Sequence, residues 1–307
     1  MLSYIGSRLL QSILVVILMT MFVFGMARLG GDPIQKMLSE EATEQDRRAL
    51  AIRLHLDKPL YEQYWIWFKL LMRGDLGMSV LDPYPVIDLL RNFAPNTLKL
   101  ALLATLFGTF TGLPLGVLAG VRRGKAADVF AGTLSVFGQS VPIFWIGLVL
   151  MYFFAIKWHV FPVVGSKGLI SAVLPSISLG LYMTAGITRL VRSAMIEAMD
   201  SDYITLARLK GLSEVIVIYK HALKNALIPV VTFAGMYFAI LMSGVVVVEV
   251  VFAWPGIGLL TFKSALAGDY PVLQGAVVLI TVAVILINLI VDIAYAFLDP
   301  RIRYLKV

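Results

Sequence analysis

The sequence predicts an all-α integral membrane protein with six membrane-spanning helices. Hydrophobic residues make up 59% of the chain and charged residues only 15%, and the mean hydropathy is +0.87, whereas about a quarter of an ordinary soluble domain is charged. Apolar runs long enough to cross about 30 Å of hydrocarbon as helix recur along the chain. These runs lack the alternation of apolar and polar residues that a membrane β-barrel requires, which makes helix the expected structure.

Six segments are expected to cross the bilayer. The first is expected to be a retained anchor and not a cleaved signal peptide, because its apolar run is long and the GMARLGGDP that follows has no small-x-small cleavage site. All six are assigned to a single transmembrane domain, 1–307. The expected spans are about 9–27, 98–120, 130–156, 173–191, 226–250 and 274–297.

An insertion of about 30–96 separates the first two spans, and its sequence predicts short helices between turns. PLYEQYWIWFKLLM places Tyr61, Tyr64, Trp65 and Phe68 on one helical stripe. Aromatic residues at this spacing favour an interfacial or packing face, and a ligand-stacking role is the alternative.

Basic residues beside the spans predict the orientation, because Lys and Arg resist transfer across a bilayer. They gather in the loop VRRGKAAD, in the tail after 300 and between 189 and 224. Both termini and the segment 202–225 are therefore expected to face the cytoplasm, with lipid around the spans. The net charge of +7 reflects this asymmetry, and no nucleic-acid partner is expected.

Four glycines in the second span recur every fourth residue and so share one helix face. A face without side chains allows another backbone to approach closely. Packing within the same bundle is the favoured interpretation, and contact with a partner subunit is the alternative. These residues are Gly108, Gly112, Gly116 and Gly120.

The stretch DYITLARLKGLSEVIVIYKHALKN, residues 202–225, is polar among apolar spans and predicts two helices joined at a glycine corner. Asp202 is the predicted N-cap of the first helix and Gly211 its left-handed stop. Ser213 is the predicted N-cap of the second helix, which begins at Glu214. A helix-turn-helix for DNA is disfavoured, because EVIVIY places apolar residues where base-reading side chains should start. Insertion into a protein groove fits better.

The sequence contains no constellation of an enzyme or of a nucleotide-binding protein. No acid pair, HExxH motif or nucleophile–base set is found, and the absence of cysteine excludes disulfides and thiolate metal sites. GVRRGKA lacks the spacing and the Ser or Thr of a phosphate-binding loop. Few ionisable residues lie deep in the expected spans, which disfavours an ion-driven transporter. No catalytic residue, metal site or cofactor of its own is therefore expected.

Many short motifs together resemble the permease subunits of ATP-binding-cassette (ABC) importers, in particular those of the dipeptide and oligopeptide group. The family's cytoplasmic signature, EAA followed by three residues and Gly, falls on Thr205, Leu206, Ala207 and Gly211, of which only Ala207 and Gly211 match. The resemblance covers nearly the whole chain. The motifs include PLYEQYW, GDLGMS, PNTLKLAL, SVPIFWIGL, RLVRSAM, SDYITLARLKGLSE, HALKNALIPV, VVEVVFAWPGIG, DYPVLQG and NLIVDIAYAFLDPRIR.

This resemblance implies a B-type permease of type I importer architecture in the cytoplasmic (inner) membrane of a bacterium. Such a subunit pairs with a homologous permease, sits on two ABC ATPase subunits that bind ATP and Mg, and receives solute from an extracytoplasmic solute-binding protein. The loop 192–225 is then expected to couple the spans to an ATPase. The expected coupling residues are Asp202, Tyr203, Thr205, Ala207, Arg208, Lys210, Gly211, Ser213, Glu214, Ile216 and His221.

On the outer side, the insertion and the loop VFAWPGIG are expected to meet the binding protein or to close an outer gate. The residues expected there are Glu249, Trp254, Pro255 and Gly256. Packing alone could also require the last three, and an interfacial hydrogen-bonding role for Glu249 stays equally open.

The function that the resemblance implies is ATP-driven import of di- and oligopeptides. Within the same family, a nickel chelate, glutathione, an opine or another peptide-sized solute is the alternative, since nothing in the spans specifies the solute. A stand-alone secondary transporter or channel is the alternative from another class.

Overall fold

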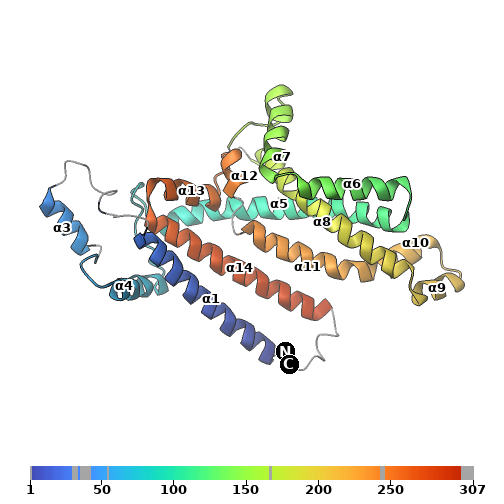
Figure 1. Cartoon of the computed structure of the whole chain (residues 1–307), viewed down its shortest axis with the longest axis horizontal. Helices are drawn as coiled ribbons and strands as arrows, with labels where there is room; N and C mark the ends of the chain where they lie inside the picture. Colours follow the sequence, from blue (N-terminus) through green and yellow to red (C-terminus); the bar gives the residue numbers. More distant parts are fainter. Residues whose placement is uncertain are drawn as a thin grey trace. The chain divides into compact units, whose positions relative to one another are not determined.

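The computed structural model describes residues 2–29, 34, 43–53, 55–165, 168–242 and 246–298. This part of the chain is helical, with an isolated bridge between Met78 and Pro85 as its one described β-type pairing, so the all-α prediction is confirmed. Figure 1 shows the helices. In chain order they are α1 (Leu2–Leu29), α3 (Glu44–Arg53), α4 (Leu60–Met72), α5 (Val86–Val121), α6 (Ala126–Ser140), α7 (Ile143–Leu150), η1 (Met151–Lys157), η2 (Ile170–Ala172), α8 (Val173–Met199), α9 (Asp202–Leu209), α10 (Glu214–Ile216), η3 (Val217–Ala222), α11 (Leu223–Met242), α12 (Val246–Val251), α13 (Ile257–Ala267) and α14 (Tyr270–Leu298).

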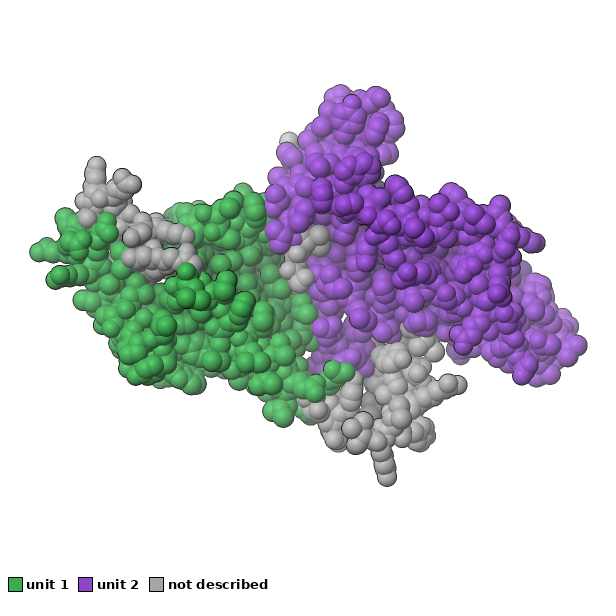
Figure 2. Space-filling model, in the orientation of Figure 1, with its two compact units in different colours: residues 1–97, 255–285 green, residues 98–254, 286–307 purple. Residues whose placement is uncertain are grey.

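The chain divides into two compact units, coloured green and purple in Figure 2. Unit 1 comprises residues 1–97 and 255–285, and unit 2 comprises residues 98–254 and 286–307. Helices α5 and α14 each contribute residues to both units.

Among the described residues, four helical segments are long and apolar enough to cross a membrane: Leu10–Leu29, Val86–Val121, Ile170–Met199 and Tyr270–Ile293. Two bent helix pairs raise the number to six if each pair is one span. The pairs are Ala126–Ser140 with Ile143–Lys157, and Glu214–Leu227 with Pro229–Met242.

The segment expected as the third span, about 130–156, is not one straight helix. Helix α6 ends at Ser140, and the helix that follows is inclined to it by 102°; Figure 1 shows α7 pointing away from α6. The break lies at Val141, whose backbone is extended (φ −85°, ψ 130°), and at Pro142, the N-cap of α7. A residue before proline is pushed out of the helical region, which explains why the helix stops there.

The segment expected as the fifth span, about 226–250, is also divided. Helix α11 contains Pro229, where the two flanking helices meet at 45°, and it ends at Met242. Helix α12 begins at Val246, and residues 243–245 lie outside the described part of the chain. Proline removes one helical hydrogen bond and its ring crowds the preceding turn, which accounts for the bend at Pro229.

The core of unit 1 joins the first turns of α5 and α14 to α13. Val86 and Leu90 of α5 pack with Ile257 and Leu260 of α13 and with Val272 of α14. A Cβ added at Gly275 would lie 2.7 Å from a methyl group of Val86, so α14 approaches α5 closely there.

Helix α4 of the insertion packs on α1 through the aromatic residues Tyr64 and Trp67, both of which contact Phe24. The hydroxyls of Tyr64 and Thr20 are 3.0 Å apart, and the Tyr64 ring meets Phe24 edge to face at 5.5 Å. This confirms the packing interpretation for Tyr64, whereas Tyr61 and Trp65 of the same stripe are exposed.

The core of unit 2 is built around α8, on which α5, α6 and α11 pack. A Cβ added at Gly108 would lie 2.7 Å from the Cβ of Met183, and one added at Gly116 would lie 2.5 Å from the Cβ of Val191. At Gly112 and Gly120 the shortest distances to α8 would be 2.8 and 2.6 Å. The favoured interpretation of the glycine face, packing within the same bundle, is therefore confirmed.

Candidate functional site

The segment 202–225 folds as the glycine corner that its sequence predicts, and it lies at the end of α8 (Figure 1). Gly211 has a left-handed backbone, with φ of 76°. Its N–H donates to the carbonyl of Arg208 (2.9 Å), and the N–H of Leu212 donates to that of Ala207 (3.4 Å). These two bonds form a Schellman motif, which satisfies the last carbonyls of α9.

The predicted N-cap of α9 is wrong by one residue. Ser201 is the N-cap, with an extended backbone (φ −83°, ψ 153°), and Asp202 is the first helical residue. A carboxylate in the first turn still interacts favourably with the helix dipole. Ser213 occupies the predicted N-cap of α10, where its carbonyl accepts a hydrogen bond from the N–H of Val217 (3.0 Å).

Two side-chain contacts hold the helices of the corner together. Arg208 donates two hydrogen bonds to the Glu214 carboxylate, at 2.8 and 3.4 Å, and this pairing raises the pKa of Arg208 above its ordinary value. The amide of Asn225 donates to the hydroxyl of Tyr203 at 2.8 Å. The angle between α9 and the following helix is thus held by side chains as well as by Gly211.

The corner buries some of its apolar residues and leaves others exposed. Ile204 and Val217 are completely buried. Exposed apolar side chains on the same helices form what we call the corner face, and such groups are unfavourable in water without a partner. Its members are Tyr203, Leu206, Leu209, Val215, Ile216 and Tyr219.

The structure brings the predicted coupling residues together in the corner. Ala207 is buried beneath α9 and His221 is half-buried on η3. The others are exposed: Asp202, Tyr203, Thr205, Arg208, Lys210, Gly211, Ser213, Glu214 and Ile216.

The residues predicted for an outer gate belong to different units. In unit 2, Glu249 and Trp254 are completely buried, and the Trp254 N–H donates to the Glu249 carbonyl at 2.8 Å. In unit 1, the carbonyl of Pro255 accepts a hydrogen bond from the Asn96 amide at 2.9 Å, and Gly256 is the N-cap of α13. Each residue thus has a local packing or capping role in its own unit.

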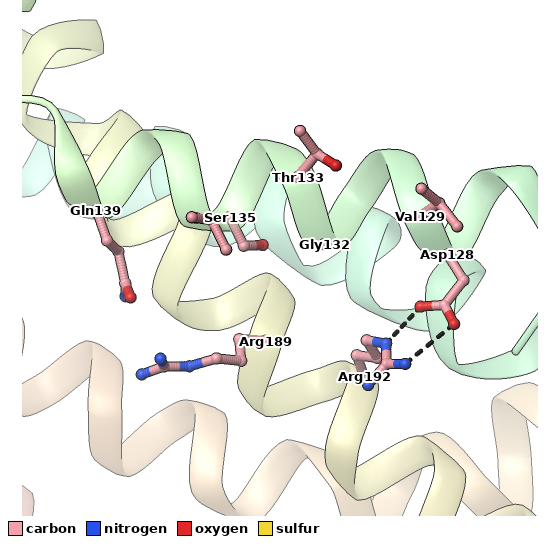
Figure 3. Close-up of a pocket in the computed structure, with 9 residues that line it drawn as sticks. Asp128, Val129, Gly132, Thr133, Ser135, Gln139, Arg189 and Arg192 are labelled. Carbon is pink, nitrogen blue, oxygen red and sulfur yellow. Dashed lines mark hydrogen bonds and ion pairs between the residues drawn. The ribbon is translucent and has the colours of Figure 1, made fainter. Parts of the chain in front are cut away.

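A cavity of about 480 Å³, lined by both charged and apolar residues, opens between α6 and α8 in unit 2 (Figure 3). The Asp128 carboxylate accepts hydrogen bonds from Nε and Nη2 of Arg192, the second at 3.0 Å. It also accepts one from the backbone N–H of Gly124 at 2.9 Å. Ser135, Gln139 and Arg189 also line the cavity. We call it the α6–α8 cavity.

The sequence does not reveal this cavity. Arg189 lies at the inner end of the expected span 173–191 and Arg192 lies just beyond it, but α8 continues to Met199, so both lie within the candidate span Ile170–Met199. Asp128 and Arg192 are 64 positions apart. The one available signal is the spacing of three between the two arginines, which places them on one helix face.

The described residues contain no group of three or more His, Cys, Asp or Glu that could hold a metal ion. The corner exposes an apolar surface, and the α6–α8 cavity contains hydrogen-bonding groups and two arginines.

Comparison with known proteins agrees with this arrangement. Residues 112–304 match the family model described as "Binding-protein-dependent transport system inner membrane component". The chain is 37% identical over 305 residues, 99% of its length and the whole of theirs, to the "Glutathione transport system permease protein GsiC" of Escherichia coli O6:H1 and of E. coli K12. A chain of the inward-facing MetNI methionine ABC transporter has the same fold, with a TM-score of 0.59 at 22% identity, over 69% of this chain and 97% of that one.

A helical membrane fold of this kind, matched over its full length, defines a permease subunit of an ABC importer, which is a transport subunit and not an enzyme. The chain belongs to the family of binding-protein-dependent transport system inner membrane components, in the peptide and oligopeptide group. It is accordingly a multi-pass protein of the inner membrane.

Proposed function

We propose that this chain forms, with a homologous permease, the translocation path of an ATP-driven importer for di- and oligopeptides. The observation that carries the solute class is the 37% identity over 99% of the chain to a glutathione permease. Glutathione is itself a tripeptide, so it falls within the size range that the sequence motifs imply.

Two ABC ATPase subunits, which bind ATP and Mg, and an extracytoplasmic solute-binding protein complete the proposed assembly. The name of the matching family, binding-protein-dependent transport, supports the last of these partners. The sequence has no phosphate-binding loop of its own, so the energy source is assigned to the partner subunits.

The corner is the proposed contact with an ATPase. Its face exposes Leu209 to 80% and Val215 to 65%, and an apolar helix surface of this kind fits a hydrophobic groove. Because α9 follows α8 almost directly, movement of the corner transmits to a membrane-spanning helix. Closure of the ATPases on ATP would thereby move the spans.

The experiment is to co-express the chain with its sister permease, the ATPases and the binding protein, and to reconstitute the complex in vesicles. We expect uptake of glutathione or trialanine that requires both ATP and the binding protein. Uptake by this chain alone, driven by an ion gradient, would instead identify a secondary transporter and refute the proposal.

The solute is identified in the same vesicles by competition. A nickel chelate or an opine that displaces trialanine and glutathione at lower concentration would assign the importer to that alternative solute. We expect peptides to compete best.

A further inference from the structure

The α6–α8 cavity contains one positive charge that nothing in its lining neutralises. Its single acidic residue, Asp128, is already paired with Arg192. Arg189 also lines the cavity, and in the described part of the chain it forms no hydrogen bond or ion pair. The cavity is therefore electrostatically suited to an anion.

Arg189 extends into the span and not toward the nearer membrane surface. In Figure 3 its side chain reaches toward the end of the cavity where Gln139 lies, away from the Asp128–Arg192 pair. At 1.5 Å per residue, its Cα lies about 15 Å along α8 from the helix end at Met199. An arginine that served lipid head groups would extend toward that end, as snorkelling side chains do.

A charged side chain within a span is costly unless it has a partner or faces a polar path. Such residues face the interior of the bundle or a water-filled cavity and mark routes for substrates. Arg189 is exposed and lines the α6–α8 cavity, to which Thr133, Ser135 and Gln139 also contribute polar groups.

We propose that the α6–α8 cavity binds the free carboxylate of the transported solute, with Arg189 as the group that contacts it. A guanidinium binds a carboxylate through two parallel hydrogen bonds, and the Gln139 amide can both donate to and accept from a peptide bond. A volume of about 480 Å³ lies within the range of small-ligand sites and is adequate for a short peptide. This inference rests on the proposed function and adds the chemical group that the permease recognises.

The charges also predict which end of a peptide is recognised. Since the Asp128 carboxylate is occupied by Arg192, no acidic side chain of the lining is left for an N-terminal ammonium. Transport should therefore be faster with a free C-terminal carboxylate than with an amide, and it should tolerate acetylation of the N-terminus.

The test uses the complete importer in vesicles and three probes: trialanine, its C-terminal amide and N-acetyl-trialanine. Because the binding protein is the same throughout, a change in preference between variants belongs to the permease. At limiting concentration, Arg189→Gln should lower the uptake of trialanine and N-acetyl-trialanine about tenfold or more and leave the slower uptake of the amide unchanged. Arg189→Lys keeps the charge but loses the paired hydrogen-bond geometry, so its uptake of trialanine should lie between that of the wild type and that of Arg189→Gln.

The matched control is Arg123→Gln. Arg123 forms an ion pair with Asp200 in which both side chains are mostly exposed, 65% and 69%, so its loss should alter no probe's uptake. Wild-type complex that imports neither trialanine nor glutathione would refute the proposed function itself. If the wild-type complex imports trialanine but Arg189→Gln lowers the uptake of trialanine and of its C-terminal amide equally, only the carboxylate site is refuted.

Two further outcomes would assign Arg189 elsewhere and overturn the inference. Failure of Arg189→Gln to co-purify with the sister permease would identify it as a subunit contact. An uptake defect of Arg189→Gln that is seen in phosphatidylglycerol vesicles but not in phosphatidylcholine vesicles, and that is the same for the peptide acid and amide, would identify a lipid site.

Discussion

Gly211 adopts a backbone conformation that a branched side chain resists, in a place where space is not the obstacle. Its φ is 76°, yet a Cβ built there meets nothing within 4 Å. A non-glycine residue in the left-handed region costs about 1–2 kcal/mol, and Asn costs less than a β-branched residue. We expect Gly211→Val to abolish ATP hydrolysis stimulated by solute and binding protein, and Gly211→Asn to retain most of it.

Membrane insertion and subunit assembly provide the control for these variants. Membrane insertion and pairing with the sister permease should both be normal in Gly211→Val, because the corner lies beyond the end of α8. Equal stimulation in the Val and Asn variants would contradict a role for the left-handed corner in coupling.

Asp128 and Arg192 form the most buried of the described ion pairs, with side chains 9% and 35% exposed. Removal of one partner leaves the other charge uncompensated, so Asp128→Ala and Arg192→Ala should each destabilise the protein. The double variant should lose less than the sum, by about 1–3 kcal/mol. Thermal unfolding of the four proteins in detergent measures this coupling, and additive losses would contradict it.

At this scale the sequence predicts local geometry well and long-range pairing poorly. The left-handed Gly211 follows from a short helix, a glycine and a new N-cap, all within a few positions. Asp128 and Arg192 meet only because α6 packs on α8, and no local pattern specifies that register. The expected span 173–191 includes Arg189 at its inner end but stops before Arg192, since hydropathy alone does not show how far α8 continues past its apolar part.

Among the elements, α5 and α8 approach each other closely through glycine. A Cβ at Gly116 would lie 2.5 Å from the Cβ of Val191 and 2.8 Å from the carbonyl oxygen of Thr188. The carbonyl belongs to the helix backbone, so it cannot turn aside as a flexible side chain could. Gly116→Ala should therefore separate the helices and destabilise the protein by about 1–3 kcal/mol.

Gly25→Ala is the matched control for this variant, because a Cβ at that position meets nothing within 4 Å. Thermal unfolding of both variants in the same detergent should show a loss for Gly116→Ala alone. Helix propensity favours Ala over Gly at both positions, so a loss of similar size in both variants would contradict the α5–α8 contact as its cause.

The sequence also predicts the type of each element more reliably than its course. Uninterrupted hydropathy across 130–156 predicts one span, but hydropathy takes no account of backbone direction, and Val141 with Pro142 divides the segment at 102°. Pro114, by contrast, lies inside α5, which continues from Val86 to Val121. The same residue type ends one helix and not another, because the packing of α5 on α8 holds the second in place.

At the scale of the whole molecule, α8 joins the two proposed functional regions. It carries Arg189 in the α6–α8 cavity and continues directly into the corner at α9. A rigid helix that lines the cavity and ends at the corner provides a physical route by which ATPase closure could alter solute binding. On this basis, occupancy of the cavity and the position of the corner are coupled through a single element.

The orientation of this helix can be tested directly, because the natural chain contains no cysteine. Leu209→Cys and Val164→Cys place single thiols after and before α8 in the sequence. Both positions are exposed: the Leu209 side chain to 80% and the Val164 side chain to 55%. The distribution of basic residues puts position 209 in the cytoplasm. A membrane-impermeant maleimide should therefore label position 164 in intact spheroplasts, and position 209 only after permeabilisation. Wild-type protein should stay unlabelled throughout. The reverse pattern would invert the protein in the membrane and place the corner where no ATPase could reach it.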